Sequence, residues 1–356
     1  MRSFVYFKEI KSNDLGALKN GLKQLLKDAP FFEKTRKKEL IPIKLTFGEK
    51  GNKGYPNPSL VKVIVDKIKA NGAKPFLTDS NVLYHGARTN AVDHINMAYE
   101  HGFLPNVCGA PIIIADGIFS ENSKEIPVDG KALSSIKVPA SILSIDSIIG
   151  LAHFTGHMLT GFGGAIKNIG MGLANRAGKQ VQHSSVKPKI YPSKCVYCKK
   201  CVEVCPVNAI DEKNQKAEID QAKCIGCADC IAACRFSAVE INWAVDVEKL
   251  EERMVEYAYG ILKRIKNSFF INILTLITKE CDCLETGTER IVEDIGIVAS
   301  TDAVALDKAS LDLVLERTKT DIFKEAHPNS DYKRQLTYGA QIGLGNLEYD
   351  LIKLQH

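Results

Sequence analysis

Short apolar runs alternate with longer amphipathic stretches along most of the chain, which predicts strands alternating with helices. The expected strands are Ser3–Phe7, Ile41–Phe47, Lys74–Thr78, Pro111–Ala115, Ser147–Ala152, Ile271–Ile277 and Gly296–Ser300. The expected helices are Asp14–Lys27, the stretch from Asn57-Pro58 to Gly72, Thr89–His101, Asp246–Lys266 and Ala303–Arg317. This order indicates an α/β fold with a mostly parallel sheet and helices on both faces.

Two cysteine runs interrupt this pattern. The first is Cys195-x2-Cys198-x2-Cys201-x3-Cys205, and the second is Cys224-x2-Cys227-x2-Cys230-x3-Cys234. This is the spacing of bacterial ferredoxins with two [4Fe–4S] clusters, in which the fourth cysteine of each run reaches the other cluster. We therefore expect one cluster on Cys195, Cys198, Cys201 and Cys234, and a second on Cys224, Cys227, Cys230 and Cys205. Structural zinc usually shows separated C-x2-C pairs, and a disulfide framework needs an oxidising compartment.

The two runs form an internal repeat that aligns without a gap. Such duplication predicts two half-modules related by a pseudo-twofold axis. Pro206 of the first half is replaced by Arg235 in the second, which places a positive charge near a cluster.

The chain is expected to contain two domains. Residues 187–242 form a small α+β ferredoxin-like insertion, and residues 1–186 with 243–356 form the α/β host. An insertion of this size has little core of its own, so the clusters are expected to hold it together. The stretch Tyr332–Leu354 is amphipathic and is expected to dock on its own host or on a second copy.

Composition narrows the setting. The 356 residues carry a formal charge of +5, with 45% hydrophobic and 25% charged residues. Two clusters at about −2 each bring the total to about +1, so we expect no nucleic-acid partner. The first residues lack the apolar core of a signal peptide, and Phe269–Ile277 is too short to span a bilayer. We expect no membrane partner and a cytoplasmic location.

Polar residues follow several predicted strands, where doubly wound sheets bind ligands. Asp79, Asp116 and His153 each come at such an end. Asp302 follows the last strand, and it either points into the site or caps the next helix.

The stretch His153–Gly172 is rich in glycine and contains one lysine, Lys167. We expect a loop in which Gly161, Gly163, Gly164, Lys167 and Asn168 bind a small anion, although a tight packing loop is the alternative. His153 and His157 are candidate acid–base groups or metal ligands, and Asp79 and Lys167 complete the candidate catalytic set. Cys281-Asp282-Cys283 either holds a further metal or contains two reduced thiols in a turn.

These motifs together resemble the DUF362 family of uncharacterised iron–sulfur centre proteins. The matching pieces are Lys44–Glu49, Thr78–Arg88, Asp116-Gly117, His153–Gly172, both cysteine runs, Cys281-Asp282-Cys283 and Asp302–Ala309. The resemblance covers most of the chain and implies clusters, but no particular reaction.

Gly163-Gly164-x-x-Lys167, with His153 and His157 upstream, also resembles a loop of the lactate-racemase family. In that family the lysine carries a nickel-pincer nucleotide. The Pro-Gly that follows there is replaced here by Asn168-Ile169-Gly170.

The sequence thus predicts an iron–sulfur redox protein that relays electrons to a small-molecule site in the host. Such a protein is either an oxidoreductase or, without substrate chemistry of its own, an electron carrier or a metal or cluster-assembly protein. A redox partner protein is expected, and Lys194, Lys199, Lys200 and Lys223 favour an acidic one. The oligomeric state and any additional metal or organic cofactor stay open.

Overall fold

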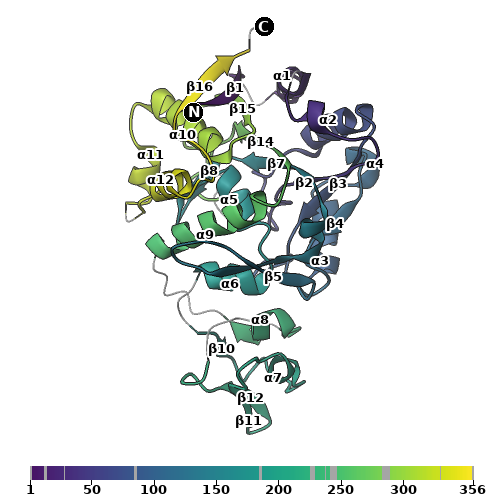
Figure 1. The fold of residues 1–356 in the computed structure, drawn as a ribbon, viewed down its shortest axis with the longest axis vertical. Coiled ribbons are helices and arrows are strands. Elements are labelled where there is room, and N and C mark those ends of the chain that lie inside the picture. Colours follow the sequence, from purple (N-terminus) through teal and green to yellow (C-terminus); the bar gives the residue numbers. More distant parts are fainter. Residues whose placement is uncertain are drawn as a thin grey trace.

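An eight-stranded sheet forms the centre of the protein in this computed structural model (Figure 1). The structure describes residues 2–11, 14–27, 29–83, 86–183, 187–224, 229–236, 238–240, 247–282, 289–328 and 330–354. The strand order is β16-β1-β15-β14-β7-β2-β3-β4. The bounds are β1 Ser3–Glu9, β2 Leu40–Lys44, β3 Lys74–Asp79, β4 Ile112–Ile114, β7 Ser147–His153, β14 Asn267–Leu274, β15 Gly296–Ser300 and β16 Tyr349–Lys353.

The sheet is mostly parallel, because β15 is antiparallel to both of its neighbours while the other strands share one direction. The fold class expected from the sequence is confirmed. The expected strand Gly296–Ser300 exists, but its antiparallel direction puts Asp302 at the opposite edge from His153. Asp302 caps helix α10 (Ala303–Thr318) there, where its side chain accepts from the amides of Val304 and Ala305 at 2.9 and 3.0 Å.

Helices cover both faces of the sheet, and alternate strand residues enter two separate cores. Ile148 and Phe270 lie in the core under α5 (Ala165–Gly170), α9 and α10, whereas Ile149 and Phe269 lie in the core under α1 and α2. Burial on both faces explains the continuous apolar runs of β7 and β14. The larger helices are α1 Leu15–Lys27, α2 Pro58–Ala70, α3 Ala91–Glu100, α9 Val247–Leu262 and α10 Ala303–Thr318.

Local signals set the helix ends where the sequence predicts them. The Asn57 side chain accepts from the amide of Ser59 at 2.9 Å, and Pro58 occupies the first turn of α2. Asn90 caps α3 in the same way.

The C-terminal stretch docks on its own host, one of the two outcomes expected for it. Strand β16 pairs in parallel with β1 at the edge of the sheet, and α12 packs against α9. The shorter elements of the host are α4 Pro105–Cys108, β5 Ser123–Pro127, β6 Ser135–Pro139, β8 Thr155–His157, β9 Gly161–Gly163, α5 Ala165–Gly170, α6 Arg176–His183, α11 Ile322–Ala326 and α12 Arg334–Gln341.

A small lobe carrying the cysteine runs projects from the side of the host on which α6 lies (Figure 1). Its elements are β10 Lys189–Ile190, α7 Lys200–Glu203, β11 Ile210–Lys213, β12 Lys216–Ile219, α8 Asp229–Ala233 and β13 Val239–Glu240. The order β10-α7-β11 is repeated as β12-α8-β13, in keeping with the internal sequence repeat. The first and last strands pair with each other, so the lobe leaves and re-enters the host at one place. The domain division at 187 and 242 stays a prediction.

Contacts of three kinds join the lobe to the host. Helices α6 and α8 pack together, Lys137 forms an ion pair with Asp229 at 2.6 Å, and Arg235 lies 4.8 Å from the centre of the Phe119 ring. Among the described helices, none is long and apolar enough to cross a membrane.

Candidate functional site

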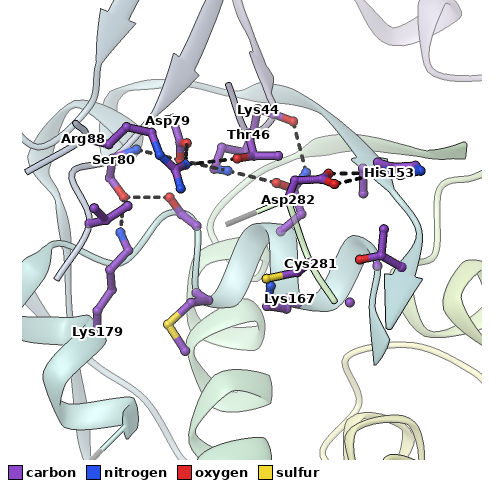
Figure 2. A pocket seen from close by; sticks show the side chains of 18 of the residues that line it. Lys44, Thr46, Asp79, Ser80, Arg88, His153, Lys167, Lys179, Cys281 and Asp282 are labelled. Carbon is purple, nitrogen blue, oxygen red and sulfur yellow. Dashed lines mark hydrogen bonds and ion pairs between the residues drawn. The ribbon is translucent and has the colours of Figure 1, made fainter. Parts of the chain in front are cut away.

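The carboxyl ends of β2, β3, β7 and β14 meet around a pocket, as expected for a doubly wound sheet. The pocket and its open mouth measure about 800 Å³ (Figure 2). The acidic and basic side chains in its lining are Lys44, Asp79, Arg88, His153, Lys167, Lys179, His183 and Asp282. Six of the candidates expected from the sequence line this pocket: Asp79, His153, Gly163, Gly164, Lys167 and Asn168.

Asp79, at the end of β3, is a buried anion surrounded by cations. Lys44 Nζ lies 3.1 Å and Arg88 Nη1 lies 3.7 Å from its carboxylate oxygens. Burial alone would raise the pKa of Asp79, but the charge of Lys44, with His94 and Arg88, holds that pKa well below its usual range. Asp79 thus stays ionised, and its role in this arrangement is to hold Lys44 and Arg88 in the pocket.

His153, at the end of β7, is held at both ring nitrogens. Nδ1 lies 3.0 Å from Asp282 Oδ1, and Nε2 lies 2.7 Å from the carbonyl oxygen of Thr275. Both partners are acceptors, so both nitrogens donate only when the ring is a cation. Burial opposes that charge, but Asp282 outweighs it and the pKa of His153 is raised. The protonated ring of His153 is therefore favoured, and neither nitrogen is free to act as a base in this structure.

The expected glycine-rich loop is a hairpin followed by a helix, which corrects the prediction of a loop. Strands β8 and β9 pair, and His157 stabilises their turn by accepting at Nδ1 from the amides of Leu159 and Thr160. His157 is absent from the described lining of the pocket. Gly161 is also absent from that lining. Glycine is required there for packing, since its φ is +66° and an added Cβ would lie 2.3 Å from Cβ of Tyr332.

Gly164 is required by the close approach of Asp307, since an added Cβ would lie 2.2 Å from Asp307 Oδ1. This carboxylate accepts from the amides of Ala165 and Ile166 at 2.7 and 2.9 Å. The first amides of α5 are thereby satisfied within the protein, so the anion expected to bind them is replaced by Asp307. Asn168 is similarly committed, because it accepts from Lys44 Nζ at 2.9 Å and donates to the carbonyl oxygen of Lys44.

Lys167 and Cys281 both line the pocket (Figure 2). The Lys167 charge acts on His157 and His183, since it contributes to lowering the pKa of both. Cys281 is buried, and Cys283 lies outside the described residues. Whether this pair holds a metal stays a prediction.

Sequence reasoning missed helix α6, whose polar sequence RAGKQVQH suggests an exposed segment. In the structure Lys179 is buried, and its Nζ donates to the carbonyl oxygen of Ala174 and to Ser80 Oγ. Burial lowers the pKa of Lys179 to about 8, although Asp116 and Asp79 act in the opposite direction. The signal available in the sequence was the spacing of Arg176, Lys179 and His183, which puts three titratable side chains on one helix face.

The four cysteines expected around the first cluster line one pocket of the lobe: Cys195, Cys198, Cys201 and Cys234. The pKa of Cys201 is raised to about 11, first by burial and then by the thiolates of Cys234, Cys195 and Cys198. Backbone amides donate to two of the cysteine sulfurs at repeat-related positions: from Ala209 to Cys205 at 3.1 Å and from Ala238 to Cys234 at 3.2 Å.

The second expected cysteine set is described in part. Cys205, Cys224 and Cys230 pack in the lobe core, and Cys227 lies outside the described residues. In the part of the chain that the structure describes, no three histidine, cysteine or acidic side chains are gathered as around a single metal ion.

Comparisons with solved structures give distant matches. A protein from Thermotoga maritima, solved by the Northeast Structural Genomics Consortium, matches with a TM-score of 0.45 and 13% identity over 94% of this chain. The lactate racemase apoprotein from Thermoanaerobacterium thermosaccharolyticum matches with a TM-score of 0.40 and 12% identity over 77% of this chain. The chain spans 60% and 51% of the lengths of these two proteins.

A comparison with curated proteins found no match. The model of one family, a domain of unknown function named DUF362, matches residues 41–312. This match covers well over half of the chain, so the protein belongs to the DUF362 family.

Proposed function

We propose that the protein binds two [4Fe–4S] clusters in the lobe and uses them to deliver electrons to a small anionic molecule in the host pocket. The observation that carries this proposal is the gathering of Cys195, Cys198, Cys201 and Cys234, drawn from both runs, in one pocket of the lobe. Bound there, such a cluster supplies one-electron transfer. The amides that donate to Cys205 and Cys234 suit thiolate ligands, because such hydrogen bonds stabilise the negative sulfur.

The pocket of the host suits an anion. Its lining contains four lysine or arginine side chains and two carboxylates. The carboxylates are already held, Asp282 by His153 and Asp79 by Lys44, which leaves the lining with excess positive charge. A small carboxylate or phosphate compound fits this balance better than a cation or an apolar molecule.

Lys179 is the side chain in the described lining best suited to move a proton. Its pKa of about 8 lies near neutrality, whereas His153 is committed at both nitrogens and Asp79 is held ionised. The proton that accompanies reduction of a bound anion would come from Lys179 Nζ, which replaces the histidine expected from the sequence.

A redox partner protein would supply the electrons. Cys198 is exposed, so one side of the first cysteine pocket reaches the surface. The expected basic surface is largely balanced, since Lys194, Lys200 and Lys223 form ion pairs with Glu240, Glu203 and Asp220. Contact near Cys198 therefore depends less on charge than the sequence suggested.

Metal content after anaerobic purification tests the proposal. Wild-type protein and Cys108→Ser, a buried thiol of the host, should each hold about eight irons and eight sulfides per chain, and Cys198→Ser should hold fewer. Zinc in place of iron would overturn the proposal. A stoichiometric second metal such as nickel would instead indicate a metal site in the host pocket, with Lys167 and Cys281 as the residues to substitute next.

The alternative of a carrier without substrate chemistry is tested at the pocket. Clusters reduced with dithionite should be reoxidised by a suitable small carboxylate or phosphate compound in wild-type protein and much more slowly in Lys179→Met. Equal behaviour of the two proteins across a panel of such anions would favour the carrier.

A further inference from the structure

Arg176 is a buried arginine at the start of α6, on the side of the host that meets the lobe (Figure 1). The residue is 3% exposed. Its backbone amide donates to Ser120 Oγ at 2.7 Å, but its Nε has no hydrogen-bond partner among the described residues. No carboxylate in the described part of the chain forms an ion pair with the guanidinium. A buried positive charge of this kind is unfavourable unless a negative charge lies close to it.

Two groups near Arg176 carry or can carry negative charge. Burial lowers the pKa of Arg176, while the Asp116 carboxylate and the Cys234 thiolate oppose that change. Asp116 is already held by Ser120 and by the amide of Asn81. Cys234 belongs to the first cysteine set, and Ala177, the residue after Arg176, packs in the lobe core with Cys195, Cys201 and Cys234.

We propose that Arg176 is a positioning residue whose charge compensates the cluster held by Cys195, Cys198, Cys201 and Cys234, and which thereby raises the midpoint potential of that cluster. The inference rests on the proposed function. A cube with four thiolates carries about −2 when oxidised and gains one further negative charge on reduction. A fixed positive charge in a buried, weakly screened place favours the more negative, reduced form.

The same helix connects this cluster to the pocket. Lys179 lies one turn after Arg176 and faces Ser80 in the pocket lining. Leu83 lines the pocket and also packs against the lobe core. These contacts connect the lobe core that contains Cys195, Cys201 and Cys234 with the pocket lining.

The test is a redox titration followed by electron paramagnetic resonance on anaerobically purified full-length protein. Arg176→Gln should shift one of the two midpoint potentials to a more negative value and leave the other unchanged. Loss of the corresponding signal in Cys198→Ser assigns the shifted potential to the first cluster. Arg235→Gln is the matched control: Arg235 adjoins Cys234 but is exposed, so water screens its charge and the shift should be smaller.

Arg176→Lys separates charge from packing. It should keep a potential close to that of the wild type, because the charge is retained. Full iron content with unchanged potentials in Arg176→Gln would overturn the inference while leaving the proposed function intact. If Arg176→Gln loses iron, its potentials cannot be compared, and Arg176→Lys is measured instead. Loss of iron or a shifted potential in Arg176→Lys would overturn the inference. Absence of iron from the wild type would instead sink the proposed function.

Discussion

The titratable side chains of the pocket differ in how completely a neighbouring opposite charge compensates their own charge. Asp79 is surrounded by positive charge and stays ionised, and Asp282 favours the protonated form of His153. Lys179 is buried with hydrogen-bond acceptors but no carboxylate in ion-pair contact within the described chain, so its charged form is less favoured than that of an ordinary lysine. Residue types alone suggested the opposite assignment, with histidines as proton carriers and a lysine as a fixed charge.

The His153–Asp282 pair should make stability depend on pH. A raised histidine pKa contributes stability that is fully present below about pH 6.5 and is lost as pH rises through the folded-state pKa. His153→Gln should therefore lower the free energy of unfolding by about 1–3 kcal/mol at pH 6, and by less at pH 9. Urea unfolding at both pH values measures this. His157→Gln should change the pH dependence in the opposite sense: burial keeps His157 neutral in the folded protein, whereas the unfolded chain binds a proton below about pH 6.5, so this variant should lose less stability at pH 6 than at pH 9.

Lys179 should titrate well below the ordinary pKa of a lysine. Its pKa of about 8 compares with an ordinary value of 10.5. Nuclear magnetic resonance of protein labelled with ¹⁵N at lysine Nζ should show one signal that changes near pH 8. That signal should be missing in Lys179→Arg and present in Lys167→Arg. A spectrum in which every lysine titrates above pH 10 would remove Lys179 as the proton donor.

At the scale of the element, helix α5 depends on a carboxylate that comes from α10. Asp307 occupies the position that an N-cap side chain would otherwise fill, and Asn272 also donates to it at 2.8 Å. Gly164→Ala would push a Cβ against this carboxylate, so we expect a loss of about 2 kcal/mol or more in unfolding free energy. Gly163→Ala is the control, because its Cβ meets only the flexible chain of Lys167. Equal stability of the two variants would contradict the Asp307 cap.

The sequence predicts most elements of the host because burial leaves a clear pattern in them. Asn57 and Pro58 mark the start of α2, and the apolar run of β7 marks a strand covered on both faces. The direction of β15 leaves no such mark, since all five residues are buried in either direction. Gly161, Gly163 and Gly164 hide the hairpin and the start of α5, because residues without side chains show no periodicity. Helix α6 was missed because the lobe and the host together bury its polar residues.

At the scale of the whole molecule, the central sheet of the host joins strands that precede the lobe in the sequence to strands that follow it. Strand β7 precedes the lobe, β14 follows it, and the two pair over seven residues from Asn267↔Ser147 to Ile273↔His153. The host core therefore does not depend on the lobe for its connectivity. The lobe has a small core of its own that consists largely of cysteines and a few aliphatic side chains.

This asymmetry predicts that iron removal unfolds the lobe and spares the host. A module of this size buries too little apolar surface to fold without its metal, whereas the host buries two large cores. After treatment with ferricyanide and a chelator, limited proteolysis should cut within residues 187–240. The two host fragments should stay associated on a sizing column, since β7 and β14 remain paired. Cys198→Ser should show partial cutting at the same place without the chelator. Protection of the lobe after complete iron loss would mean that its core, and not its clusters, holds it together.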